Sequence, residues 1–187
     1  MTEDWQPSLA ATKVQPPVPP RHLVQRSRLD DALDSAVAAQ VPLVLVSAPA
    51  GSGKSTLLSG WLATRPEAVA WLQVEEPDSD PARFWSYLVR AVGRALPDLL
   101  VLDLMLPEVN GEDASVVPAL VNRLSELPQR LLLVVDDYHL VDDDRVHRGV
   151  ERLVDLCPSQ VTLVLATRVD PPFRIGRLRV RGRVAEV

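Results

Sequence analysis

The chain has 187 residues, of which 47% are hydrophobic and 24% are charged, and its formal net charge is −5. This size and balance suit one α/β domain with a sizeable core, and the acidic charge argues against general nucleic-acid binding by the chain itself. The sequence has no apolar run near the roughly 20 residues of a membrane helix, no secretion-signal layout and a single cysteine, Cys157. We therefore expect no membrane partner, no internal disulfide and a cytoplasmic location.

Secondary-structure signals alternate along the chain. Residues 1–20 are rich in proline and predict an extended arm, and a helical pattern begins at Ser27. Strands are expected at 41–48, 68–74, 130–137 and 160–168, and helices at 55–65, 80–96, 113–127 and 142–157. This alternation indicates an α/β domain over residues 21–187, with a mostly parallel sheet of about five strands. The fifth strand is expected to begin at 183–187, and because no helix closes it, we expect a longer protein.

The segment Ala48–Ser55 reads A-P-A-G-S-G-K-S and matches the phosphate-binding pattern G-x-x-x-x-G-K-[ST] at every position except the first. Gly51 and Gly53 allow the backbone bend that turns N–H groups toward phosphate oxygens, and the next helix adds the positive end of its dipole. Lys54 would contact the β- and γ-phosphates, and the Ser55 hydroxyl would ligate Mg²⁺. Alanine at the first position is compatible with this mechanism if its φ is negative. The predicted nucleotide-binding residues of the loop are Pro49, Ala50, Gly51, Ser52, Gly53, Lys54, Ser55 and Thr56.

Lysine is rare in this chain, which makes the lysine of the loop informative. Of 20 cationic residues, 18 are arginine and two are lysine, Lys13 and Lys54. Composition therefore does not explain a lysine in the sequence GSGKST. A glycine-rich turn with a surface lysine is the alternative, but strand, loop and helix follow one another in the order that a P-loop requires. The sequence thus predicts a P-loop NTPase, a three-layer αβα sandwich that binds ATP or ADP.

Acidic residues follow the apolar run that ends the strand expected at 130–137. Asp136 would hold Mg²⁺ through its water shell, and Asp137 would orient or deprotonate an attacking water molecule, so Asp137 and Lys54 are the predicted catalytic residues. Without the P-loop, the two aspartates would be explained equally well as the end of a strand and the start of a turn. Arg168 ends another strand, where it would sense the γ-phosphate or, alternatively, be an exposed loop residue.

Two further segments carry signals of other functions. The segment Leu100–Gly111 resembles the phosphoacceptor turn of a receiver domain, but no lysine follows Lys54, so an apolar helix or loop packed on the sheet is expected instead. Alternation near the C-terminus would place Arg177, Arg179 and Arg181 on one face of a strand. No aromatic residues interleave with these arginines, so a solvated edge or a protein interface is expected in preference to a nucleic-acid contact.

Several stretches together resemble one family. The sequences RFW at 83–85, DDYHL at 136–140 and ATRVDPP at 166–172 are similar to those in the N-terminal ATPase domain of MalT-like, large LuxR-type transcriptional regulators, in the STAND class of signalling ATPases. The resemblance begins near Lys13 and includes Ala48, since the family's loop typically starts with alanine. It implies that the second aspartate of DDYHL is the family's second acidic residue. It also implies that the segment HLVQRSRL packs on the adenine, with these candidate contacts: Val24, Arg26 and Arg28.

The resemblance implies a regulatory switch. ADP would hold a closed monomer, whereas ATP and an inducer would favour an open, self-associating form that slow hydrolysis resets. The family's winged-helix, helical-repeat and DNA-binding regions would follow Val187, so we expect contacts with other domains of the same chain and no DNA binding by this segment alone. Two alternatives remain. One is a small-molecule P-loop kinase with residues 174–183 as a lid, and the other is a scaffold that does not hydrolyse, or does not bind, nucleotide.

Overall fold

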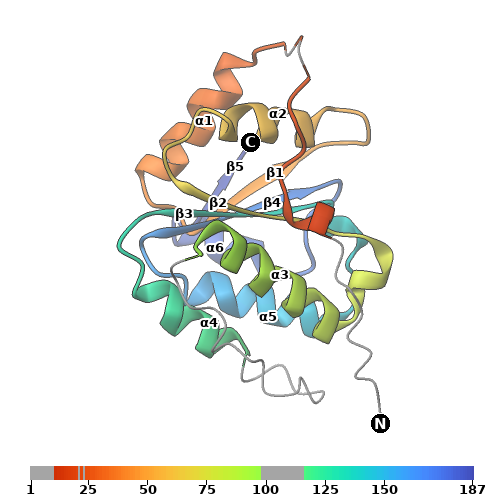
Figure 1. The fold of residues 1–187 in the computed structure, drawn as a ribbon, viewed down its shortest axis with the longest axis vertical. Helices are drawn as coiled ribbons and strands as arrows, with labels where there is room; N and C mark the ends of the chain where they lie inside the picture. Colours follow the sequence, from red (N-terminus) through yellow and green to blue (C-terminus); the bar gives the residue numbers. More distant parts are fainter. Residues whose placement is uncertain (1–10, 21, 23, 98–115) are drawn as a thin grey trace.

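Five parallel strands form the sheet at the centre of the molecule, with helices on both faces (Figure 1). The computed structural model describes residues 11–20, 22, 24–97 and 116–187. The strands follow the order β2-β3-β4-β1-β5, and every neighbouring pair is parallel. Their bounds are β1 Leu43–Ser47, β2 Ala68–Gln73, β3 Leu131–Asp136, β4 Val161–Thr167 and β5 Val184–Glu186. The predicted α/β fold is confirmed.

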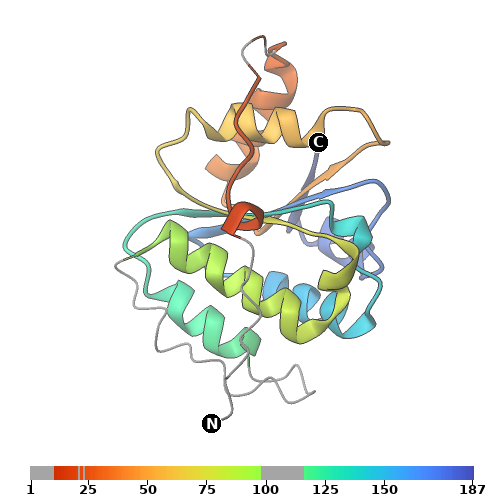
Figure 2. The same ribbon diagram turned by 45° about the vertical axis from the view of Figure 1, so that its right-hand side comes forward.

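Helices divide into two layers. α1 and α2 cover one face of the sheet, and α3, α4 and α5 cover the other (Figures 1 and 2). The bounds are α1 Ser27–Ala38, α2 Lys54–Leu62, α3 Pro81–Ala95, α4 Val116–Ser125, α5 Asp144–Asp155 and α6 Ile175–Val180, with the short 3-10 helices η1 Ala11–Val14, η2 Glu76–Ser79 and η4 Tyr138–Leu140. In the described ranges, no helix is long and apolar enough to cross a membrane. The architecture is the predicted three-layer αβα sandwich.

The central strands are buried on both faces because both layers pack against them. Along β1, Leu43 and Leu45 belong to the core shared with α3, α4 and α5, whereas Val44 and Val46 belong to the core shared with α1 and α2. Successive side chains of a strand point to opposite faces, so a doubly covered strand needs apolar residues at every position. This explains the continuous apolar runs and places the polar residues that follow them at one edge of the sheet.

β5 attaches the end of the chain to the strand that leads into the P-loop. It pairs in parallel with β1, and Val187 extends this pairing. The Val187 N–H donates to the Leu45 carbonyl oxygen (3.0 Å), and the Ser47 N–H donates to the Val187 carbonyl oxygen (3.3 Å). The expected fifth strand is therefore confirmed, in a shorter form.

The prediction that Arg177, Arg179 and Arg181 share one face of a strand is wrong, because this segment forms α6 and its last turn. Ile175 and Leu178, three residues apart, are buried on one side of the helix, a spacing that a strand would place on opposite faces. The helix stops where Gly182 adopts a φ of 64°, a left-handed conformation that commonly ends helices.

The proline-rich arm is also not extended throughout. Residues 11–14 form η1, in which Lys13 and Val14 are buried, so these residues are packed on the domain. Residues 1–10 and the receiver-like segment at 100–111 lie outside the described residues.

Candidate nucleotide-binding site

The P-loop connects β1 to α2 at the carboxyl edge of the sheet, beside the end of β4. Gly51 (φ 75°) and Gly53 (φ 83°) have left-handed conformations that other residues rarely adopt. Gly53 immediately precedes the first turn of α2, whose free N–H groups open onto the loop. Ala48 is not among the residues with positive φ, and its N–H donates to the Thr167 carbonyl oxygen (3.2 Å). Alanine therefore fits the position where the general pattern has glycine.

Lys54 is held inside this loop, with 8% of its surface exposed. Its Nζ donates to the carbonyl oxygens of Ala48 (2.7 Å) and Pro49 (3.2 Å). Among the described residues, Lys54 forms no salt bridge. A buried ammonium that is hydrogen-bonded only to neutral carbonyl groups, with no carboxylate of the described residues in direct contact, favours the binding of an anion.

Asp136, at the end of β3, is fully buried. Its Oδ1 accepts from the Asp137 N–H (2.9 Å), whereas Oδ2 has no hydrogen-bond partner within the described part of the chain. Burial raises the pKa of the Asp136 carboxyl, and the nearby Ser55 hydroxyl and Lys54 partly offset this rise. A buried carboxylate oxygen without a partner is unfavourable unless a cation or water satisfies it. Ser55 and Asp136 therefore fit a Mg²⁺ ion that binds together with nucleotide phosphates.

Asp137 has a backbone φ of 55°, an uncommon conformation for a residue with a side chain. Its Oδ2 accepts from Gln73 Nε2 (2.7 Å), and its Oδ1 lies 3.9 Å from His139 Nδ1. Gln73 ends β2 in register with Asp136, so the strand pairing itself brings the amide to the carboxylates. Asp137 is thus held in a defined position at the carboxyl edge of the sheet.

A cavity of about 230 Å³ brings the P-loop, Asp137 and Arg168 together. The lining residues come from the ends of β1, β3 and β4 and from the start of α2; they are Ala50, Gly51, Gly53, Lys54, Ser55, Thr56, Asp137 and Arg168. The structure therefore places two distant residues, Asp137 and Arg168, on the same cavity as the loop. The volume and the cationic lining suit phosphate groups.

His139 lies next to this group and was not selected by the sequence patterns, although it belongs to the DDYHL segment. The imidazole is buried, and neither ring nitrogen has a hydrogen-bond partner within the described ranges. Burial lowers the pKa of His139, and the positive charges of Arg168 and Lys54 lower it further, against the opposite effect of Asp137. These effects favour the neutral form of the imidazole. Gln73 was missed for a different reason, since only the pairing of β2 with β3 brings it to Asp137.

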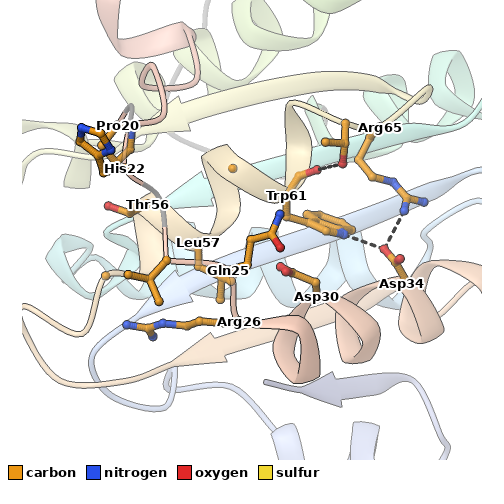
Figure 3. A pocket seen from close by; sticks show the side chains of 14 residues that line it. Pro20, His22, Gln25, Arg26, Asp30, Asp34, Thr56, Leu57, Trp61 and Arg65 are labelled. Carbon is orange, nitrogen blue, oxygen red and sulfur yellow. Dashed lines mark hydrogen bonds and ion pairs between the residues drawn. The ribbon is translucent and has the colours of Figure 1, made fainter.

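A larger cavity, of about 380 Å³, adjoins the first along α2 (Figure 3). Gly53 and Thr56 line both cavities, and the remaining walls are formed by Pro20, His22 and 24–26 together with residues of α1, of α2 and of the turn after α2. Trp61 is one wall, and its indole Nε1 donates to Asp34 Oδ1 (2.7 Å). The Arg65 guanidinium donates to the same oxygen (2.6 Å) and lies 5.3 Å from the centroid of the Trp61 ring. These contacts fix an aromatic surface beside the P-loop.

The three predicted adenine contacts do not occupy equivalent positions. Val24 and Arg26 line the larger cavity, whereas Arg28, on the first turn of α1, is not among its lining residues. Arg26 Nη2 is 3.6 Å from the point that a Cβ on Gly53 would occupy, so this guanidinium lies against the P-loop. The contacts of each residue with a bound base remain predictions.

This arrangement agrees with the comparison of the sequence with known families. Residues 24–165 match the AAA ATPase domain family. The chain belongs to this family. The AAA ATPase match includes the P-loop, both acidic residues at the end of β3 and most of β4, and the predicted P-loop NTPase fold is confirmed.

The AAA ATPase domain is similar to segments of longer proteins. It is 35% identical to the HTH-type transcriptional regulator MalT of Serratia proteamaculans over 96% of this chain, and 34% identical to the serine/threonine-protein kinase PknK of Mycobacterium tuberculosis over 97%. The chain spans 20% and 17% of the lengths of these relatives, respectively. The predicted relationship to MalT-like regulators is therefore confirmed for this domain.

Solved structures share the same fold. Cdc6p from Pyrobaculum aerophilum superposes with a TM-score of 0.58 at 15% identity, covering 95% of this chain and 49% of that chain. A chain from the Drosophila ORC complex bound to AT-rich DNA and Cdc6 also gives a TM-score of 0.58, at 12% identity, covering 86% of this chain and 52% of that chain. At these identities the similarity shows the fold of the AAA ATPase domain and nothing more about this chain.

Proposed function

We propose that this domain is the nucleotide-binding switch of a larger transcriptional regulator, and that it binds ATP or ADP together with Mg²⁺. The observation that carries the proposal is the pair of adjoining cavities that share Gly53 and Thr56. One presents an ammonium without a salt bridge in the described part of the chain and helix N–H groups, which suit phosphates, and the other presents an aromatic wall, which suits a base. A nucleotide likewise has phosphates at one end and a base at the other, so one molecule could occupy both cavities.

The residues of the smaller cavity take separate roles in this proposal. Lys54 and the loop N–H groups would bind the β- and γ-phosphates, and Arg168 would contact the γ-phosphate. Ser55 and Asp136 would hold Mg²⁺, which supplies charge neutralisation of the phosphates when it is bound. Asp137 would orient or deprotonate the attacking water. Slow hydrolysis is supported by the Gln73 amide, which already occupies one oxygen of that carboxylate.

The regulatory part of the proposal rests on the relatives and on the family resemblance. One relative is a transcriptional regulator and the other a protein kinase, and each contains a segment similar to this domain within a much longer chain. A domain that occurs in proteins of such different names suits a control element better than a dedicated catalyst. We propose that ATP favours self-association and ADP a closed monomer, and that DNA binding requires other domains.

The small-molecule kinase alternative gains no support from the arginine-rich segment at 174–183. Such a kinase would need this segment as a mobile lid. Instead, Ile175 and Leu178 are buried in the core shared with α3 and α5, and Arg183 Nη2 donates to the Val154 carbonyl oxygen (2.7 Å). The switch therefore remains the function that the site supports best.

The proposal is tested by identifying the nucleotide that copurifies with the protein and by measuring ATP and ADP affinity in the presence of Mg²⁺. Lys54→Ala should weaken ATP binding by about 100-fold, equivalent to roughly 3 kcal/mol, since it removes charge-assisted contacts to two phosphates. Arg123→Met, which removes an exposed cation of α4 paired with Glu126, is the matched control and should bind normally. Equal binding by the wild type and Lys54→Ala would refute the site.

A further inference from the structure

The second lysine of the chain, Lys13, lies in a cluster that is separate from the P-loop. Its Nζ contacts Asp78 Oδ2 and Glu75 Oε2 (3.1 Å), and it lies 4.6 Å above the centroid of the Tyr87 ring. The Arg83 guanidinium donates to Asp78 Oδ1 (2.7 Å) and lies over the same ring (5.5 Å). We call these five residues the Lys13 anchor. They join η1 to η2 and α3, beside the edge strand β2.

The Lys13–Asp78 ion pair at the centre of the anchor is buried, whereas the Glu75 and Arg83 side chains are partly exposed. Lys13 is 5% exposed and Asp78 is fully buried. Asp78 Oδ2 also accepts the Glu75 N–H (2.9 Å), so both carboxylate oxygens have partners. Val14, the next residue, is 3% exposed and belongs to the core shared with α3 and α5. η1 is therefore held in place by both charge and apolar burial.

A strap leads from this anchor to the larger cavity. It consists of the described residues 15–20, 22 and 24–26, and it runs from η1, at the level of the sheet, to the start of α1 (Figures 1 and 2). The described residues between Pro16 and Gln25 make no hydrogen bond. Val18 and Val24 are 91% and 79% exposed, so apolar burial does not hold this part either. The strap is thus positioned from its two ends.

The strap is rich in proline, so fixing its two ends also fixes the positions of the residues between them. Four of its residues are proline, which restricts the backbone to extended conformations and makes the segment a semi-rigid spacer. At the far end, Pro20, His22 and Val24 line the larger cavity, followed by Gln25 and Arg26. A semi-rigid segment transmits the position of its fixed end to its other residues. Without the anchor, the cavity wall would be fixed by α1 at one end and, at the other, only by the burial of Val14.

We propose that Lys13 is a positioning residue for the base-binding end of the nucleotide site. It acts through the strap, because the anchored η1 sets where the wall formed by Pro20, His22 and Val24 lies against α2. The inference rests on the proposed nucleotide function of the two cavities. It assigns Lys13 no contact with nucleotide, and it leaves the phosphate end unaffected.

Removing the anchor should lower the fraction of molecules in which the strap is positioned to bind the base, and this fraction determines the effect on ATP affinity. The apparent dissociation constant equals the intrinsic constant divided by the fraction of molecules in the binding-competent state. If Lys13→Met lowers that fraction to about one tenth, the dissociation constant for ATP rises about tenfold. Inorganic tripolyphosphate, which needs only the P-loop, should bind the variant and the wild type equally.

The experiment compares the wild type with Lys13→Met, Lys13→Arg and the surface control Arg123→Met. Dissociation constants for Mg-ATP and tripolyphosphate are measured for each. We expect Lys13→Met to weaken ATP alone, Lys13→Arg to restore most of the affinity because it keeps the charge, and the control to match the wild type. Glu75→Gln, which removes only the half-exposed carboxylate and keeps an oxygen to cap η2, replaces Lys13→Met if that variant does not fold.

A second measurement needs no ligand. Nitroxide labels at Val18→Cys on the strap and Ala63→Cys after α2, in a Cys157→Ser background, report the distance between the strap and the helix. The distance distribution should be narrow with Lys13 and broad with Lys13→Met. Unchanged ATP affinity with an unchanged distribution overturns the inference, as does an equal loss of ATP and tripolyphosphate affinity. Failure of the wild type to bind ATP overturns the proposed function instead.

Discussion

The chain contains two lysines, and the two regions that bury them differ in one respect. Lys13 meets two carboxylates in the anchor, whereas Lys54 meets only backbone carbonyl oxygens in the P-loop. Both are nearly inaccessible to solvent, so burial alone does not distinguish them. The distinction is whether a carboxylate contacts the ammonium directly. A buried cation in direct contact with carboxylates has a structural role, and one without such a contact is available to a ligand.

Two buried aspartates repeat this contrast. Asp78 has partners on both carboxylate oxygens, whereas Asp136 has an oxygen without a partner in the described part of the chain. Burial raises the pKa of the Asp136 carboxyl, so its charged form costs free energy in the folded protein. The anchor region should therefore support stability, and the P-loop region should reduce stability in exchange for ligand binding.

The largest expected effect is on hydrolysis at the P-loop region. Asp137→Asn removes the carboxylate that would orient or deprotonate water but keeps its shape, and the ATP hydrolysis rate should fall by about 10²- to 10⁴-fold. ATP affinity should change little because the phosphate contacts come from other residues. Single-turnover hydrolysis and equilibrium ATP binding separate the two effects. An unchanged rate would remove Asp137 from the proposed mechanism.

The next effect concerns stability at the anchor. Asp78→Asn leaves Lys13 and Arg83 without their buried carboxylate, and the free energy of unfolding should fall by about 3 kcal/mol. Urea denaturation of both proteins measures the difference. A loss below about 0.5 kcal/mol would mean that the anchor contributes no more than an exposed salt bridge, and the contrast between the regions would disappear.

The same aspartate-to-asparagine substitution at the P-loop region should raise stability instead of lowering it. Asp136→Asn removes a charge with a raised pKa, so it should stabilise the nucleotide-free domain by about 1 kcal/mol, or about 2–4 °C in Tm. Because the folded state favours the protonated carboxyl, the wild type is penalised only as the pH rises through the raised pKa. The stabilisation should therefore be small in acid and complete at neutral pH. Thermal denaturation across pH measures this trend, and a loss of stability at neutral pH would contradict it.

The smallest expected effect is at Tyr138, and it tests where the nucleotide site ends and the core begins. Tyr138 directly follows Asp137, yet its hydroxyl is paired with His147 Nδ1 (2.8 Å) in the core. Tyr138→Phe should cost about 1 kcal/mol of stability, the usual net value of one buried hydrogen bond. ATP affinity should stay unchanged, as measured by titration. A large loss of affinity would mean that the P-loop region extends into the core behind it.

The fold and the phosphate end of the site follow from local patterns in the sequence. The apolar runs of β1, β3 and β4 predict strands covered on both faces, and the polar residues after them meet at one edge because parallel strands end together. Asp137 and Arg168 therefore reach the P-loop as expected, although their roles there remain proposals. These signals need only the order of neighbouring residues.

The parts that were missed depend on contacts between distant residues. Lys13 contacts Asp78, which lies 65 residues further along the chain. The sequence around η1 therefore gives no indication that η1 packs on the domain. Gln73 reaches Asp137 only through the pairing of β2 with β3. In α6, the alternating arginines predicted a strand, but the segment is helical because a helix buries Ile175 and Leu178 on the same side. Tertiary burial overrode the local pattern there.

The pairing of Val187 with β1 has a mechanical consequence. Its N–H and carbonyl groups are bonded to Leu45 and Ser47, and the P-loop begins one residue after Ser47. Val187 is thus attached directly to the strand that leads into the P-loop. A force applied at Val187 would act first on these two backbone hydrogen bonds, and through them on the residues next to the P-loop.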